Sequence, residues 1–213
     1  MRHSPLLLVA LPALVLGCGK KGDDDSPATS ATPAPTSTTQ PTTAVATSRV
    51  QRVLPKPGEV WGRDLAAALA LDEFELCREL GTSDCIREAH LVTLGGVEAE
   101  RLGIDEPVAN ALVSAPIAFD RVAISACGER FDRDGGSDAV LFGPVLDDDG
   151  AAARQTVSEN LVRRLLARQP TQADIDALEG LHERLEPISD DLTRDWSVGA
   201  CVVVATSTEA LFY

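Results

Sequence analysis

Lysine is missing from residues 61–213, the part of this sequence that has the composition of a folded domain. All 13 basic residues of this part are arginine, and its 29 acidic residues give it a net charge of −16. Nucleic-acid binding needs a basic surface, so this charge balance argues against a nucleic-acid partner. It also argues against direct docking on anionic lipid headgroups. It is compatible with a soluble domain, with divalent cations or with a basic partner.

The motifs that identify common enzyme classes are missing as well. The chain has no G-x-S-x-G, no Walker loop, no H-E-x-x-H and no C-x-x-C-H, and Gly95-Gly96 belongs to no G-x-G-x-x-G pattern. We predict that His182 lies on a solvated helix face and that His90 is partly buried. The enzymatic alternative is an exported hydrolase that uses Asp or Glu with His90.

Long apolar runs are also scarce, and the one near the N-terminus spans the 12 residues 5–16. This length fits the core of an export signal, about 7–15 residues, and falls short of the roughly 20 of a membrane-spanning helix. Arg2 and His3 supply the positive start that such a signal has. The alternatives for this segment are a lipoprotein signal and an ordinary secretory signal.

The four residues Val15-Leu16-Gly17-Cys18 resemble the lipobox of bacterial lipoproteins. The resemblance implies a signal peptide over residues 1–17, cleavage before Cys18 and attachment of lipid, including palmitate, to Cys18. Two or three acyl chains give stable membrane anchoring. Gly19 follows the cysteine in place of the aspartate that favours inner-membrane retention, so the resemblance implies delivery to the outer membrane.

Residues 18–60 are predicted to be a disordered linker. The stretch 26–47 is rich in Pro, Ala, Ser and Thr and carries no charge, so it cannot bury enough apolar surface to offset its ordering entropy. A flexible coil of about 41 residues spans roughly 35 Å, and a polyproline-like one up to about 125 Å. The linker would therefore hold the domain, residues 61–213, away from the membrane.

The chain has five cysteines, and assigning Cys18 to lipid leaves an even set of four. Four cysteines allow three pairings in an exported protein. We predict the pairs Cys77–Cys85, which flank a tight corner, and Cys127–Cys201. The alternatives are a metal site formed by Cys77, Cys85 and His90, and a buried free thiol at Cys127.

The apolar periodicity predicts a mostly α-helical single domain of about six helices. The Ala- and Leu-rich residues 61–80 favour a helix, and a second short helix follows a cap at Asp84. The predicted core positions and caps are Ile117, Ile124, Cys127 and Phe131 after Pro116; Val157, Leu161 and Leu165 in 151–168; Ile175, Leu178, Leu181 and Leu185 after a Thr171–Asp174 capping box; and Ser189 as the cap of a last helical segment, in which 201–204 is alternatively a strand.

Asp132, Asp134 and Asp138 have the spacing of calcium ligands. An EF-hand loop that starts at Asp132 would need Gly at its sixth position and Glu at its twelfth, but Ser137 and Gly143 stand there. We keep a calcium site of another type as a hypothesis beside a plain acidic turn.

The stretches RRLLARQPTQADIDAL and ATSTEALFY, within residues 163–213, resemble the closing helices of bacterial exported proteins that carry cytochrome-c-like modules. That segment has no established activity in the family, so the resemblance implies none. We therefore expect an envelope lipoprotein that acts as a non-catalytic binding or scaffolding module, with the membrane and other envelope proteins as its partners. The alternatives are the hydrolase described above and a calcium-stabilised module.

Overall fold

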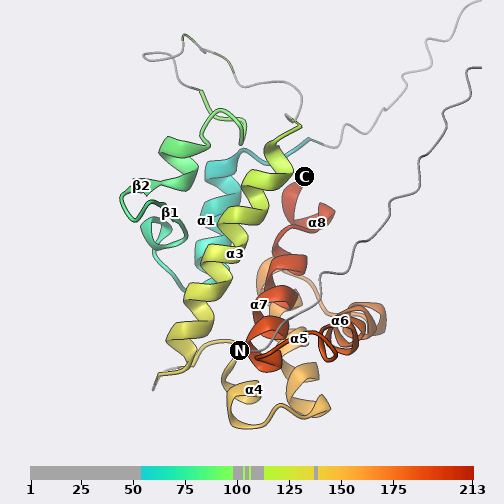
Figure 1. The fold of residues 1–213 in the computed structure, drawn as a ribbon. Helices are drawn as coiled ribbons and strands as arrows, with labels where there is room; N and C mark the ends of the chain where they lie inside the picture. The colour runs from blue at the N-terminus through green and yellow to red at the C-terminus, as the bar shows by residue number, and fades with distance from the viewer. Residues whose placement is uncertain (1–53, 98–102, 104–105, 107–112, 137–138) are drawn as a thin grey trace, which may run out of the picture. The chain divides into compact units, whose positions relative to one another are not determined.

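The computed structural model describes residues 54–97, 103, 106, 113–136 and 139–213, and helices dominate them (Figure 1). These residues form a mostly helical single domain with two disulfides, as the sequence predicts. The elements are α1 (Gly58–Leu69), η1 (Glu73–Glu75), β1 (Arg78–Glu79), β2 (Ser83–Asp84), the π-helix η2 (Cys85–Ala89), α3 (Ala115–Asp134), α4 (Gly143–Asp147), α5 (Ala151–Leu166), α6 (Gln172–Leu185), α7 (Leu192–Ala205) and α8 (Thr208–Leu211).

Helices α3 and α7 pack antiparallel through the centre of the core. Cys127 of α3 is bonded to Cys201 of α7, with 5.9 Å between their Cα atoms, and further along α3 Asp132 pairs with Arg194. The helices can approach closely because the facing residues are small, among them Ala126 and Ala200, which are fully buried like both cysteines. The predicted pair Cys127–Cys201, which we call the α3–α7 disulfide, is confirmed.

The two tryptophans fix the remaining helices to this centre. On α1, Trp61 packs edge-on against Phe119 with 4.8 Å between ring centroids, and its Nε1–H donates to the Ala205 carbonyl. On α7, Trp196 donates to the Leu178 carbonyl of α6. Both indoles are almost completely buried, so each adds a hydrogen bond to a large apolar contact.

The chain joins the domain before residue 61, where composition places its start. The amide of Lys56 donates to the Leu211 carbonyl, the amide of Tyr213 donates to the Leu54 carbonyl, and α1 begins at Gly58. Residues 54–60, predicted to be part of the linker, are therefore ordered against the C-terminal residues. The composition of residues 54–60 does not reveal that they are ordered, because their backbone hydrogen bonds are made with residues far away in the sequence.

The helix predicted over residues 61–80 is wrong beyond Leu69. Ala70 takes a left-handed conformation with φ 51°, and its N–H donates to the carbonyls of Ala66 and Ala67. The turn lets Leu71 and Leu76 enter the core. Burial of these side chains outweighs the helix preference of the Ala- and Leu-rich sequence.

The predicted core stripe of α3 is only half correct. Cys127 and Phe131 are buried, whereas Ile117 and Ile124 are 65% and 55% exposed. The buried face is carried mainly by alanines and by Val122, residues too small to dominate an apolar pattern. Arg130 of the same helix is charged but only 4% exposed, because it pairs with Asp134 inside the core.

The C-terminal helices largely follow the sequence. Asp84 caps η2, and Thr171 and Asp174 form the predicted capping box of α6. Residues 201–204 are helical within α7, as the main prediction had it. The cap of α7 is Asp191 in place of the predicted Ser189, whose hydroxyl instead donates to Asp195.

Four predicted core positions of α5 and α6 are less buried than expected, and one predicted surface position is more buried. Val157, Leu161 and Leu178 are buried, but Leu165, Ile175, Leu181 and Leu185 are only half-buried. His182 is half-buried edge-on to Trp196, so the prediction of a fully solvated side chain is wrong. None of the helices in the described part of the chain is both long enough and apolar enough to cross a membrane.

Candidate functional site

A small disulfide-closed hairpin projects from the domain beside α3. Strands β1 and β2 pair antiparallel, with Arg78 opposite Asp84. Cys77 and Cys85 flank the strands and are bonded to each other, with 5.5 Å between their Cα atoms. This bond, which we call the hairpin disulfide, confirms the predicted pair. It rules out the alternative metal site, because both sulfurs are already bonded.

Leu80 stands at the tip of this hairpin in a strained and exposed position. Its φ is 51° and that of Gly81 is 75°, and the Thr82 amide donates to the Glu79 carbonyl across the turn. Turns with two positive φ angles favour Asn or Asp followed by Gly, and a left-handed conformation costs other residues about 1–2 kcal/mol. Leu80 is nevertheless 97% exposed. Nothing within the domain explains an apolar side chain there.

A polar cluster fixes the hairpin to the outer side of α3. Arg121 contacts both carboxylate oxygens of Glu79, at 2.7 and 3.0 Å. His90 places Nε2 3.2 Å from the same carboxylate. About three turns further along α3, Arg133 pairs with both Glu75 and Glu129. These pairs are partly exposed and individually weak, but together they set the position of the hairpin on the helix.

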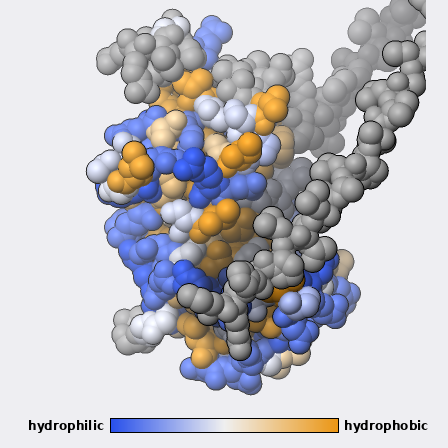
Figure 2. All heavy atoms as spheres, in the orientation of Figure 1, coloured by the Kyte–Doolittle hydropathy of each residue, from blue (hydrophilic) through white to orange (hydrophobic). Residues whose placement is uncertain are grey.

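The exposed side of α3 also carries apolar side chains. Ile117 and Ile124 lie on this side, and a cavity of about 320 Å³ separates it from the hairpin. The cavity is lined by Cys77, Arg78, Glu79, Arg121, Ile124 and Ser125. In Figure 2, hydrophobic residues follow the diagonal along which α3 runs in Figure 1, with hydrophilic residues beside them. We call Leu80, Ile117, Ile124 and this cavity the hairpin–α3 face.

The residues predicted for a hydrolase are only partly brought together. His90 is partly buried, as predicted, and lies beside a carboxylate, that of Glu79. Ser125 lines the neighbouring cavity, but His90 donates to or accepts from no hydroxyl of another described residue. An imidazole–carboxylate pair that is also bound to a guanidinium supplies a structural link between the hairpin and α3.

The predicted calcium ligands have other partners. Asp134 accepts hydrogen bonds from the amides of Val140, Leu141 and Phe142 at 2.8, 2.8 and 2.7 Å, and it pairs with Arg130 at 2.6 Å. Asp132 pairs with Arg194, which lowers the pKa of the Asp132 carboxyl. Asp138 lies outside the described residues, as does the predicted lipid-attachment residue Cys18. The described residues contain no group of three or more His, Cys, Asp or Glu side chains arranged to hold a metal.

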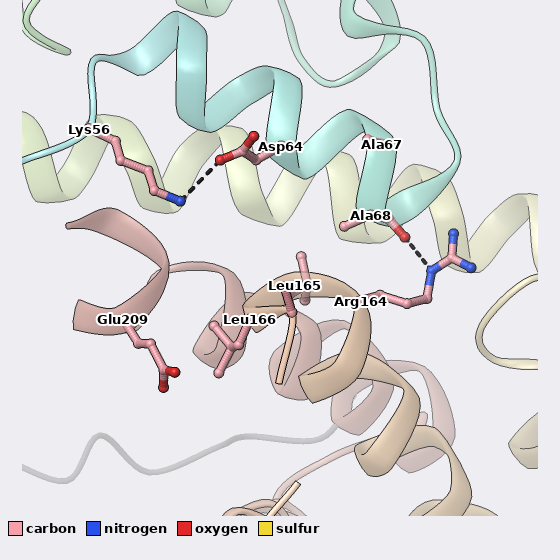
Figure 3. Close-up of a pocket in the computed structure, with 9 residues that line it drawn as sticks. Lys56, Asp64, Ala67, Ala68, Arg164, Leu165, Leu166 and Glu209 are labelled. Atoms are coloured by element: carbon pink, nitrogen blue, oxygen red, sulfur yellow. Dashed lines mark hydrogen bonds and ion pairs between the residues drawn. The ribbon is translucent and has the colours of Figure 1, made fainter. Parts of the chain in front are cut away.

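A second cavity, of about 440 Å³, lies between α1, the end of α5 and α8 (Figure 3). Its charged side chains are engaged within the domain. Lys56 donates to Asp64 at 3.0 Å, and Nε of Arg164 donates to the Ala68 carbonyl. The arrangement holds α1 against α5.

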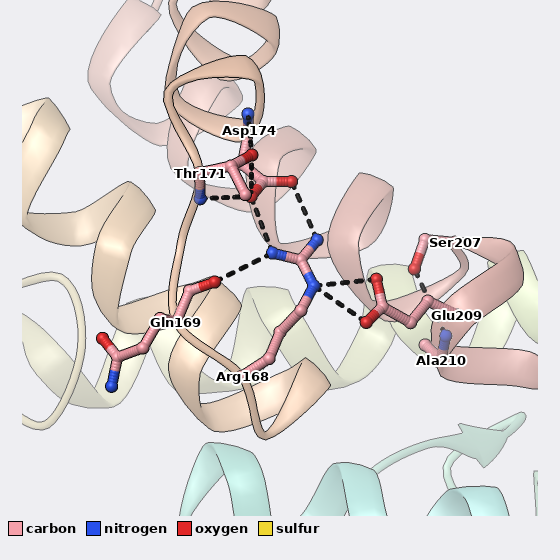
Figure 4. A network of polar contacts seen from close by, with 7 residues as sticks. All are labelled: Arg168, Gln169, Thr171, Asp174, Ser207, Glu209 and Ala210. Atoms are coloured by element: carbon pink, nitrogen blue, oxygen red, sulfur yellow. Dashed lines mark hydrogen bonds and ion pairs between the residues drawn. The ribbon is translucent and has the colours of Figure 1, made fainter.

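Arg168 forms the most connected polar network of the described residues, and the sequence analysis missed it (Figure 4). Its guanidinium donates two hydrogen bonds to Asp174, two to Glu209 and one to the Gln169 carbonyl. The Arg168 guanidinium, with the amide and hydroxyl of Thr171, holds the pKa of Asp174 well below its usual range. This network joins the ends of α5, α6 and α8, and only the spacing of Thr171 and Asp174 signalled part of it.

Comparison of the chain with models of protein families, with curated proteins and with solved structures gives no match.

Proposed function

We propose that this chain is a lipid-anchored envelope protein whose helical domain binds another protein through the hairpin–α3 face. The observation that carries the proposal is the exposure of Leu80 on the hairpin and of Ile117 and Ile124 on α3, together with a cavity that Ile124 lines with residues of the hairpin. Contiguous apolar surface that is rimmed by polar groups is typical of interaction sites on soluble domains.

The way in which this surface is built supports the same function. The hairpin disulfide and the Glu79–Arg121 pair hold Leu80 in place without covering it. A side chain that is already held in its binding position loses little conformational entropy when a partner docks. The surface therefore combines apolar contact area with preorganisation, and both favour affinity.

The N-terminal sequence supports a location of this domain near a membrane. With residues 54–60 ordered on the domain, a lipid on Cys18 and a linker of about 35 residues would confine the domain within roughly 33 Å of the anchor, or up to about 110 Å if extended. Confinement raises the effective concentration of a domain toward partners on the same membrane. The two disulfides support a location outside the cytoplasm, where such bonds persist.

Two measurements test this function in cells that produce the chain. Metabolic labelling with radioactive palmitate should label the wild-type protein and leave Cys18→Ala unlabelled. A photo-crosslinking amino acid at position 80 should give a discrete adduct, whereas the same group at Ile188, which is 77% exposed between α6 and α7, should not. Equal crosslinking from the two positions would refute docking through this face.

A further inference from the structure

The charges beside the hairpin–α3 face indicate the chemistry of its partner. Asp120 follows Ile117 by three residues and precedes Ile124 by four, so the three side chains are neighbours on the surface of α3. Asp120 is exposed and forms no ion pair with another described residue. Arg121, the adjacent cation, is already bound to Glu79. A carboxylate that has no ion pair with another described residue is therefore placed between two exposed apolar side chains.

The whole domain is negatively charged, like the Asp120 carboxylate. Its net charge of −16 attracts basic partners from a distance and repels a second copy of the chain. Within about 8 Å, the screening length at physiological salt, Asp120 selects which basic side chains fit. Charge complementarity of this kind mainly sets partner choice and association rate, while the apolar contacts supply affinity.

We infer that the hairpin–α3 face binds a basic amphipathic helix of a partner protein, an inference that rests on the docking function proposed above. An apolar stripe on that helix would pack between Leu80 and Ile124, and one apolar side chain would enter the 320 Å³ cavity. Lysine or arginine next to the stripe would reach Asp120. The eight residues from Ile117 to Ile124 span about 10 Å, so two turns of the partner helix cover them.

This mode of binding also explains the strain at Leu80. Asn would fit the left-handed turn with less strain than Leu, as turn preferences show. A leucine at this position is therefore unfavourable for the free domain and useful only in contact with a partner. Strained residues that the fold itself does not require are concentrated at functional sites. The substitution Leu80→Asn thus separates stability from binding.

The inference is tested with synthetic helical peptides of about 15 residues, long enough to form a helix. The full chain carrying Cys18→Ser, which removes the acylation site, is titrated with an amphipathic Leu/Lys peptide by isothermal calorimetry. A Leu/Glu peptide and an Ala/Lys peptide serve as controls for charge and for apolar contact. We expect the Leu/Lys peptide to bind at least about tenfold more tightly than either control, the ratio that 1.4 kcal/mol gives.

Variants of the chain decide whether binding occurs at this face. Leu80→Asn and Ile124→Ser should each weaken Leu/Lys binding by about tenfold, as expected for a hot-spot side chain. Asp120→Asn should weaken it less, and the loss should shrink in high salt. The matched control Ile188→Ser should leave the affinity unchanged. Leu80→Asn should also melt at the wild-type temperature or above, which a purely structural role for Leu80 does not allow.

Several outcomes would overturn the inference. Equal affinity for the Leu/Lys and Leu/Glu peptides, or loss of binding in Ile188→Ser as large as in Ile124→Ser, would show general adhesion to an acidic or apolar surface. A wild-type dimer in sedimentation experiments that Ile124→Ser dissociates would assign the face to a second copy. If a crosslink from position 80 forms in the envelope while the Leu/Lys peptide fails to bind, the docking function stands and the basic helix is wrong. If the peptide binds but no crosslink forms, the chemistry of the face stands and the envelope function is wrong.

Discussion

Replacing Asp134 with alanine is expected to destabilise the domain more than any other single removal of a charge among the described residues. The Asp134 side chain is fully buried at the end of α3 and holds the amides of residues 140–142. Leu141 and Phe142, two of the three residues held in this way, are themselves fully buried in the core. The carboxylate therefore fixes the chain segment that follows α3.

The magnitude follows from the groups that Asp134→Ala leaves without a partner. Arg130 is 4% exposed and would keep a buried charge with no carboxylate beside it, and breaking a buried pair in this way costs about 3–5 kcal/mol. Hydrogen bonds to a charged group contribute about 1.5–3 kcal/mol each, although contributions within one network do not add. We expect a loss of at least about 4 kcal/mol, a large share of the roughly 5–15 kcal/mol that stabilises a typical domain.

Urea unfolding of the oxidised chain, followed by far-ultraviolet circular dichroism, measures this loss. With a slope of about 2 kcal/mol per molar urea, the midpoint should fall by about 2 M. Arg130→Met should cost less, because Asp134 keeps its three amide donors. Asp132→Ala on the same helix is the control, since its exposed pair with Arg194 should contribute at most about 1 kcal/mol. An Asp134→Ala variant no less stable than Asp132→Ala would refute the reasoning.

Three further predictions concern single features of the core and its network. Ser197→Ala should raise the melting temperature, because the Ser197 hydroxyl is buried and has no hydrogen-bond partner among the described residues. Replacing both cysteines of the α3–α7 disulfide, which lie 74 residues apart, should lower the free energy of unfolding in urea by about 4 kcal/mol. Replacing those of the hairpin disulfide, which lie 8 residues apart, should lower it by about 2.5 kcal/mol. A larger loss for the hairpin disulfide would contradict the loop-closure argument. Asp174→Asn should destabilise the chain at neutral pH, because Arg168 lowers the folded-state pKa of Asp174. The stabilisation by the Asp174 carboxylate is present above its unfolded-state pKa of about 4 and is lost as the pH falls through its folded-state pKa. The difference in stability between the variant and the wild type should therefore disappear in strong acid.

The parts of the fold that the sequence predicts are those encoded by neighbouring residues. Thr171 and Asp174 mark the start of α6 because a capping box needs only four consecutive positions. Asp84 marks the start of η2 in the same way. The number of cysteines, together with the lipid assignment of Cys18, predicted two disulfides, and the structure confirms both pairs.

The parts that the sequence does not predict depend on contacts between distant residues. The end of α1 at Leu69 is set by burial of Leu71 and Leu76, which a local helix preference cannot register. The charge of Arg130 suggested an outer face, although a carboxylate four residues later allows it to be buried. An ion pair of this kind has the same sequence signature on the surface and in the core.

The hairpin–α3 face was missed for the opposite reason, since its residues fit the pattern of a core. Ile117 and Ile124 extend the apolar spacing of Cys127 and Phe131, so periodicity alone assigned all four to one buried stripe. The buried side of α3 instead uses alanine, which lets α7 approach closely and leaves the larger isoleucines facing solvent. A helix that faces the core mainly with small residues and presents two isoleucines to solvent has two packing surfaces. The α3–α7 disulfide closes the inner one within the domain, and the outer one is the surface that we propose binds a partner.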